Sequence, residues 1–181
     1  MGDAAEEFAI GAVAPGFELP DTDGRAHSLG EPNGSVATVV FWTCNHCPYA
    51  LAWHDRLLDV ARDYGDRDVR FFAINSNYAV THPADSYEAM QERLRNEEWP
   101  LPYLHDESQE VAHAWGALKT PDVFILDASH VLRYRGAPDP DYGDPAHRAS
   151  WVREALDDVL AGEGVRLAET EPVGCGVKWK K

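Results

Sequence analysis

Cys44 and Cys47 are the residues best suited to chemistry, and only Asn45 and His46 separate them. A cysteine thiolate is both a nucleophile and a metal ligand, and two cysteines this close in the chain can form a disulfide. The third cysteine, Cys175, lies far away in the sequence. The pair predicts a redox-active dithiol. The alternatives are part of a zinc or copper site, which usually takes four ligands, and a buried structural pair.

The segments on either side of the pair predict how it is held. Residues 36–42 form an apolar run of strand-forming residues. After the pair, apolar residues recur three and four positions apart, which predicts a helix; they are Ala50, Trp53, Leu57, Val60 and Tyr64. We therefore expect the dithiol on one face of the first helical turn, with Pro48 tolerated there and Cys44 exposed at the positive helix end.

His46, between the two cysteines, adds an electrostatic hypothesis. An imidazolium and a helix N-terminus both favour a thiolate, and a stabilised thiolate makes the dithiol couple more oxidising. The alternative is a solvated histidine that leaves the thiols unchanged. His46 is therefore predicted to modulate the dithiol.

Periodicity and turn signals predict the remaining elements. Residues 13–30 read as a small N-terminal hairpin or a loop, residues 69–74 as a buried strand, and residues 123–126 and 131–134 as a hairpin. Asp85, followed by Glu88, is consistent with a helix cap, and Asp144-Pro145 is expected to begin a long C-terminal helix. Shorter elements are a possible edge strand at 103–104 and a helix from Ser108 to near Gly116.

Three segments resemble one family. They are residues 44–49 (Cys-Asn-His-Cys-Pro-Tyr), an opening with Pro15, Phe17, Leu19, Asp21 and Gly24, and the ending Pro-Val-Gly-Cys-Gly-Val-Lys-Trp at 172–179. This pattern is similar to the peroxiredoxin-like branch of the thioredoxin superfamily, the alkyl hydroperoxide reductase/thiol-specific antioxidant type. The resemblance implies an α/β thioredoxin-like fold, with a four- or five-stranded mixed sheet flanked by helices, an N-terminal hairpin and a central helical insert. We expect a single domain over residues 1–181, ending in a cysteine-containing tail at about 165–181.

The resemblance also implies roles for individual residues. Cys44 corresponds to the attacking cysteine and Cys47 to the resolving one, while Thr120-Pro121 corresponds to a cis-proline that lies against the dithiol and positions substrate. Two departures matter. Val40 stands where thioredoxins often place a buried acid, and the peroxiredoxin Pro-x-x-x-Thr-x-x-Cys loop is absent, although Cys47 aligns with its peroxide-attacking cysteine.

Three functions follow as hypotheses. The leading one is a thiol–disulfide oxidoreductase that requires neither a bound cofactor nor a metal and is recharged by a thiol reductant. The second is a thiol-dependent peroxidase in which Cys175 resolves. The third, from another class, is a non-enzymatic metal carrier that uses Cys44, Cys47 and a histidine.

Cys175 carries a prediction of its own. Val173, Val177 and Trp179 alternate with smaller or polar residues, which predicts a strand-like tail laid along the body. Such a tail would bring Cys175 within reach of the dithiol, in its own chain or in a neighbour's. The alternative is a passive exposed thiol.

The net charge of the chain limits which binding partners are expected. The net charge is −15, with 31 acidic residues against 16 basic ones, so nucleic acid and anionic membranes are excluded as expected partners. The expected partners are a disulfide-bearing protein or a small thiol or peroxide, with oligomer formation possible. The acidic N-terminus lacks a secretion signal and no apolar run approaches the ~20 residues of a membrane span, so we expect a cytoplasmic protein. Only four lysines occur, which suggests a halophilic source; the alternative is an ordinary acidic protein.

Overall fold

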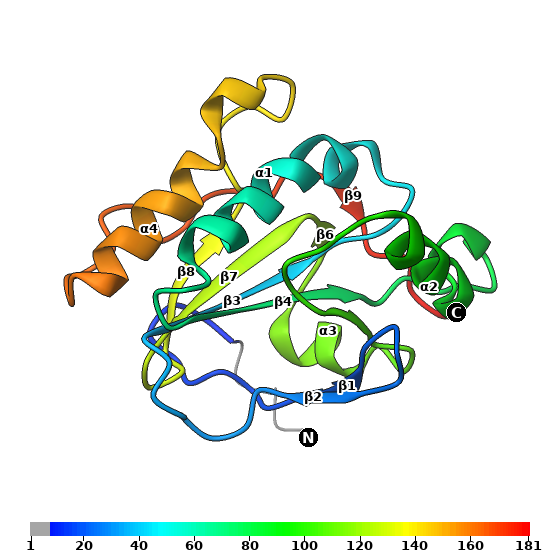
Figure 1. The fold of residues 1–181 in the computed structure, drawn as a ribbon, viewed down its shortest axis with the longest axis horizontal. Coiled ribbons are helices and arrows are strands. Elements are labelled where there is room, and N and C mark those ends of the chain that lie inside the picture. The colour runs from blue at the N-terminus through cyan, green and yellow to red at the C-terminus, as the bar shows by residue number, and fades with distance from the viewer. Residues whose placement is uncertain (1–7) are drawn as a thin grey trace, which may run out of the picture.

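The computed structural model describes residues 8–181 and is built on a five-stranded mixed sheet with the order β5-β4-β3-β7-β8 (Figure 1). Its strands are β3 (Ala37–Trp42), β4 (Val69–Asn75), β5 (Tyr103–His105), β7 (Asp122–Asp127) and β8 (Leu132–Gly136). β3, β4 and β5 are parallel, whereas β7 and β8 run antiparallel to their neighbours. The expected mixed sheet, its edge strand and the second hairpin are confirmed.

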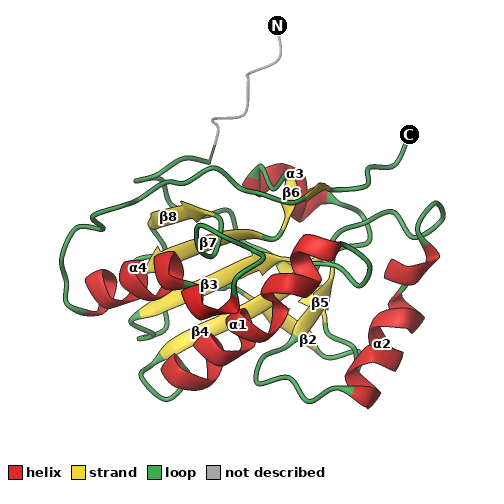
Figure 2. Ribbon diagram, turned by 90° about the horizontal axis from the view of Figure 1, so that it is seen from above, coloured by secondary structure: helices red, strands yellow, loops and turns green. Residues whose placement is uncertain are grey.

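Helices cover both faces of the sheet (Figures 1 and 2). The helices α1 (Pro48–Tyr64) and α4 (Ser150–Leu160) pack on one face, where α2 (Tyr87–Asn96) also contributes Met90. On the opposite face lie α3 (Glu110–Trp115) and the N-terminal hairpin of β1 (Glu18–Pro20) and β2 (Ala26–Ser28). The predicted N-terminal hairpin is thereby confirmed.

The central strand β3 shows why this sequence forms a doubly covered sheet. Successive side chains of a strand point to opposite faces. Val39 and Phe41 enter the core under α1 and α4, whereas Val40 and Trp42 enter the core on the side of α3. Because both faces are buried, the strand is a continuous apolar run rather than an alternating one.

The predicted start of the C-terminal helix at Asp144-Pro145 is wrong. Pro145–His147 form a separate 3₁₀ turn, and Arg148 and Ala149 adopt left-handed conformations with φ of 53° and 55° before α4 begins. The cause is long-range: the buried Ala149 N–H donates to the carboxylate of Asp139 at 2.9 Å. Asp139 therefore holds the chain in a bend that local sequence patterns do not reveal.

The ends of several elements meet at one edge of the sheet. Parallel strands place their carboxyl ends together, so the segments after β3 and β4 are neighbours there. The start of the antiparallel β7 and the preceding β6 (Lys119–Thr120) lie at the same edge. This edge carries the dithiol.

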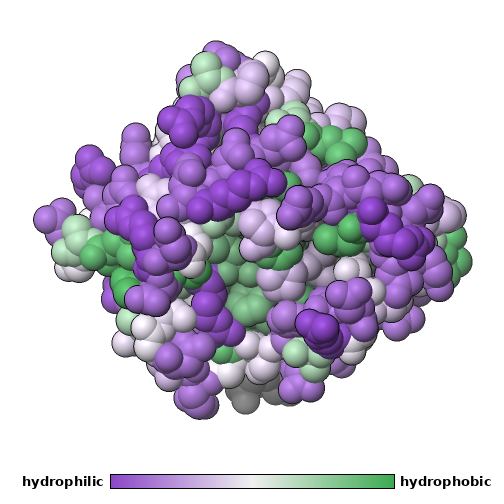
Figure 3. Space-filling model, viewed as in Figure 1, coloured by the Kyte–Doolittle hydropathy of each residue, from purple (hydrophilic) through white to green (hydrophobic). Residues whose placement is uncertain are grey.

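Hydrophilic residues cover most of the face seen in Figure 3. Between residues 8 and 181, no helix has the length and apolar character to cross a membrane. The single-domain organisation over residues 1–181 stays a prediction, and its first seven residues lie outside the described part.

Candidate active site

The dithiol lies where β3 passes into α1. The helix begins at Pro48, so Cys47 is its N-cap residue and Cys44 lies in the preceding loop. The expectation that both cysteines share a helical turn is therefore wrong, because a proline is favoured at the first helical position and fixes the start there. The two cysteines are nevertheless in contact, since the Cys47 N–H donates to the Cys44 sulfur at 3.3 Å.

The exposed position expected for Cys44 is also wrong. Neither Cys44 nor Cys47 has any solvent-exposed surface. Part of the cause is Arg93 of α2, which donates to the Cys44 carbonyl at 3.2 Å and to the Asn45 side chain at 3.0 Å. Cys175 covers the pair from another side. The burial of the dithiol thus depends on segments far from it in sequence.

Thr120 lies against both sulfurs, as expected for a positioning residue. The Cys47 thiol donates to the Thr120 carbonyl oxygen at 3.3 Å, and the Thr120 hydroxyl lies 3.6 Å from the Cys44 sulfur. The Thr120-Pro121 peptide bond is cis, as predicted. The positions of both residues agree with the resemblance, whereas their effect on a substrate stays a prediction.

The two thiols differ in acidity. A hydrogen bond from the Cys44 thiol lowers the pKa of Cys47 to about 4; Cys175, Thr120 and the Ala50 N–H contribute further donors, and burial opposes them. The same pairing with Cys47, burial and the charge of Asp85 raise the pKa of Cys44. The hydrogen bond to the Thr120 carbonyl requires a protonated Cys47 and therefore favours the thiol form. The hydrogen bonds that Cys47 accepts favour the thiolate form, and their effect on the pKa is the larger one. The directions of the two shifts favour Cys47 as the thiolate of the reduced pair.

This acidity gives a pH prediction. A cysteine in an unfolded chain loses its charge as the pH falls below about 8.5. In the folded, reduced protein, one thiolate is expected to persist to about pH 5 and to be lost with a midpoint near 4. The ultraviolet absorbance of the thiolate during an acid titration measures this, and Cys47→Ser should remove the step. A step near pH 8 alone would contradict the assignment.

Asp85 is a site residue that the sequence interpretation placed wrongly. Ser86, not Asp85, caps α2, and its hydroxyl accepts from the Ala89 N–H at 3.1 Å. The Asp85 carboxylate is instead fully buried and turned toward the dithiol loop. It accepts from the Asn45 N–H at 2.6 Å and also binds His46. Asp85 thus fixes the backbone and the histidine between the two cysteines.

Two asparagines complete the surroundings of Asp85. Asn75 ends β4, and its side-chain amide donates to Asp85 at 3.2 Å; the Asn77 amide donates to the other carboxylate oxygen at 3.0 Å. A buried carboxylate is tolerated only when its oxygens accept hydrogen bonds. Asn75 and Asn77 therefore supply hydrogen bonds that stabilise the buried Asp85 carboxylate.

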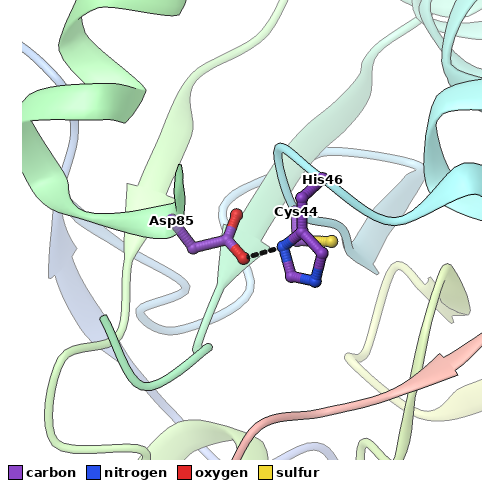
Figure 4. Close-up of side chains that lie close together, drawn as sticks. All are labelled: Cys44, His46 and Asp85. Atoms are coloured by element: carbon purple, nitrogen blue, oxygen red, sulfur yellow. Dashed lines mark hydrogen bonds and ion pairs between the residues drawn. The ribbon is translucent and has the colours of Figure 1, made fainter. Parts of the chain in front are cut away.

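Cys44, His46 and Asp85 form a cluster in which one ligand-type atom of each lies within 4.8 Å of the others (Figure 4). His46 bonds Asp85 through Nδ1, which leaves Nε2 for other partners, and the ring stacks on His82 at 5.3 Å. An acid-oriented imidazole beside a thiol can accept or return its proton. Proton transfer by this pair, like the predicted influence of His46 on the dithiol, stays a prediction.

The same cluster is a poor fit for the metal-carrier hypothesis. A metal bound by this cluster would need an Asp85 oxygen, but both oxygens already accept two hydrogen bonds each. The carrier hypothesis, which uses Cys44, Cys47 and a histidine, stays a prediction. The cluster also includes Cys44 rather than both cysteines. Metal binding by Cys44, His46 and Asp85 would require hydrogen bonds to the Asp85 carboxylate to break.

Cys175 joins the dithiol from the C-terminal tail. It belongs to β9 (Cys175–Gly176), and it packs against Cys44, Cys47 and Ala50 while keeping part of its own surface exposed. The expected strand-like tail close to the dithiol is confirmed, and it lies on its own chain. What Cys175 does there stays a prediction.

Comparison with known proteins places the chain in a family. The family model described as "AhpC/TSA family" matches residues 10–135. The chain belongs to this family. The expected resemblance is confirmed, and the matched segment includes the dithiol, Asp85 and Thr120.

Curated relatives fall into two groups. The chain is 28% identical over 127 residues to the thiol-disulfide oxidoreductase ResA of Geobacillus thermodenitrificans, covering 69% of this chain and 67% of the relative. It is 25% identical over 131 residues to peroxiredoxin Q of Oryza sativa subsp. japonica, covering 68% of this chain and 57% of the relative. Both names denote thiol-based oxidoreductases. The present chain, as a member of the same family, is an oxidoreductase.

Solved structures support the fold. An uncharacterized conserved protein from Geobacillus kaustophilus superposes with a TM-score of 0.89 and 39% identity, covering 97% of this chain and 94% of that one. The exposed lipoprotein thioredoxin of Streptococcus pneumoniae gives a TM-score of 0.57 at 19% identity, covering 75% and 98%. The predicted thioredoxin-like α/β fold is confirmed.

Proposed function

We propose that this protein catalyses thiol–disulfide exchange with Cys44 and Cys47. The observation that carries the proposal is that the two cysteines pack together at the start of α1, with the Cys47 N–H donating to the Cys44 sulfur at 3.3 Å. A thiolate paired with a neighbouring thiol is the minimum equipment for the reaction. The relatives named as thiol-disulfide oxidoreductases support the same reaction.

The first step uses the Cys47 thiolate. Its sulfur attacks one sulfur of a substrate disulfide, so the Cys47–substrate bond forms as the substrate disulfide breaks. The leaving substrate sulfur takes up a proton. The resemblance assigned this attack to Cys44, but the lowered pKa of Cys47 and the raised pKa of Cys44 favour Cys47.

The second step uses Cys44. It loses its proton and attacks the Cys47 sulfur, and the second substrate sulfur leaves as a thiolate. We assign the proton to His46, whose ring is close enough to act through one bridging water molecule and is oriented by Asp85. The dithiol has then given two electrons to the substrate and ends as the Cys44–Cys47 disulfide. A thiol reductant restores it.

A peroxidase is the second candidate, favoured by the acidity of Cys47 and by the peroxiredoxin Q relatives. Cys47 would attack a peroxide oxygen, releasing water or an alcohol and leaving a sulfenic acid. A second thiol, Cys44 or Cys175, would attack that sulfur and release water as the disulfide forms.

Insulin reduction with a dithiol donor separates the candidates from each other and from a metal carrier. Thiol–disulfide exchange predicts insulin reduction that requires both Cys44 and Cys47, with little peroxide consumed under the same conditions. Peroxide consumption without insulin reduction would favour the peroxidase. Stoichiometric zinc or copper in the purified protein, with neither activity, would favour the carrier.

We further propose a disulfide-bearing protein as substrate, in the cytoplasm of a salt-loving organism. The net charge of −15 supports the last point, because like charges repel in the folded state and salt screens that repulsion. The thermal unfolding midpoint of the reduced protein is expected to rise from dilute buffer to molar KCl. An unchanged or falling midpoint would count against adaptation to salt.

A further inference from the structure

The C-terminal tail is fastened on the edge that carries the dithiol. Its strand β9 pairs antiparallel with β6, so that Cys175 lies opposite Thr120 (Figure 1). Backbone and side-chain contacts fasten the residues that follow: Val177 N–H to Leu118 O at 3.0 Å, Lys178 N–H to the Asn77 side chain at 2.8 Å, and Trp179 stacked on His113 at 4.2 Å. The position of Cys175 is therefore set by the fold.

The tail closes the site from outside. Thr120 touches both dithiol sulfurs, and its backbone is the one that β9 pairs with. A substrate strand that approached the sulfurs along Thr120 would need the place that the tail occupies. Cys44 and Cys47 have no exposed surface, whereas Cys175 is partly exposed. Cys175 is therefore the one cysteine of the three that is partly exposed to solvent.

We propose that Cys175 exchanges disulfides with Cys47 and thereby carries electrons between the buried dithiol and partners outside. The Cys175 thiolate attacks the Cys47 sulfur of the Cys44–Cys47 disulfide. A Cys47–Cys175 disulfide forms, the Cys44–Cys47 bond breaks, and Cys44 leaves as a thiolate that takes up the proton lost by Cys175. The step needs no external oxidant, and it rests on the proposed function.

Cys47 is the sulfur that both partners reach. Cys44 and Cys175 both pack against Cys47, so either can become its disulfide partner. The partly exposed Cys47–Cys175 disulfide would then react with an external thiol more readily than the buried Cys44–Cys47 disulfide does.

The charge on Cys47 regulates this exchange. Burial, the hydrogen bond to Cys47 and the negative charge of Cys47 raise the pKa of Cys175 to about 11. The last two causes vanish once Cys47 is part of a disulfide, because a disulfide sulfur carries no charge. Oxidation of the dithiol therefore favours ionisation of Cys175, so that Cys175 becomes a nucleophile when it has a disulfide to attack.

Two glycines of the tail provide a matched test that leaves every cysteine in place. A Cβ at Gly174 would lie 2.1 Å from the Thr120 carbonyl oxygen, so Gly174→Ala forces β9 away from β6. A Cβ at Gly176 would meet only the Leu118 oxygen at 4.0 Å, so Gly176→Ala leaves the tail seated. Each variant adds one methyl group at a residue next to Cys175.

The experiment maps disulfides by mass spectrometry of peptides from the full chain, after mild oxidation and without reductant. We expect a Cys47–Cys175 link beside the Cys44–Cys47 link in the natural sequence. In Cys44→Ser, Cys47–Cys175 should be the main link. Gly174→Ala should reduce its yield in that background by about tenfold, and Gly176→Ala should not, because exchange requires sulfurs in contact.

The outcomes separate this inference from the proposed function. A Cys44–Cys47 link with Cys175 always free, or Cys175 linked only between chains, would overturn the inference and leave the exchange reaction standing. Equal yields in Gly174→Ala and Gly176→Ala would also overturn it. Absence of the Cys44–Cys47 link together with absence of insulin reduction would remove the proposed function and this inference with it.

Discussion

Cys47→Ser is expected to abolish insulin reduction, whereas Cys44→Ser in a Cys175→Ser background is expected to trap the substrate on Cys47. Cys47 is the proposed nucleophile, and a serine hydroxyl at its position is not ionised at neutral pH. Without Cys44 and Cys175, no thiol of this chain remains to attack the Cys47–substrate bond. The mixed disulfide should therefore accumulate.

Gel electrophoresis without reductant measures the trapped species, with a disulfide-bearing protein as the substrate. The matched control is Cys47→Ser in the same Cys175→Ser background, which retains Cys44 as its only cysteine and should form no adduct. The opposite result would be an adduct in the variant that keeps only Cys44 and none in the variant that keeps only Cys47. It would make Cys44 the attacking cysteine and Cys47 the resolving one. It would restore the division that the family resemblance implies.

The dithiol, its strand and its helix could be predicted because their signals are local. Strand-forming residues before Cys44 and helical spacing after Cys47 lie within one short stretch. The helix α1 starts after the dithiol rather than including it, since Pro48 fixes the helix start and leaves Cys47 as the cap. The N-terminal hairpin and the parallel core strand were likewise specified by nearby residues.

The surroundings of the dithiol could not be predicted, because they come from distant segments. Asp85 followed by Glu88 looks like a helix cap, and nothing local shows that its carboxylate turns back to Asn45, forty residues earlier. A signal did exist. The run Asn75-Ser76-Asn77 follows a buried strand parallel to β3, and polar residues at such an end share the edge with Cys44.

Burial of Cys44 is another long-range property. It requires Arg93 on α2 and the tail cysteine, and sequence spacing fixes neither position relative to β3. The acidity of each thiol depends on that packing. The sequence could therefore identify the two cysteines, but it could assign the attacking and the resolving role only from the family resemblance.

Asp85→Asn is expected to slow thiol–disulfide exchange by about 10–100-fold, since small displacements of reacting groups have effects of this size. The natural carboxylate accepts four hydrogen bonds, two at each oxygen. An asparagine side chain replaces one oxygen with an amino group, so two of the four donors would face another donor. Whichever pair is lost, either the Asn45 backbone or the His46 ring is released.

The variant will also be less stable, because a buried donor without a partner costs about 1–3 kcal/mol. Asp139→Asn is the matched control, since Asp139 is equally buried and accepts from Trp53, Arg56 and Ala149. Thermal unfolding gives the stability of each variant, and insulin reduction is measured well below both midpoints. The activity of Asp85→Asn should then fall much further than that of Asp139→Asn. Similar activities in the two variants would mean that Asp85 contributes stability alone, and the proton-transfer role given to His46 would lose its support.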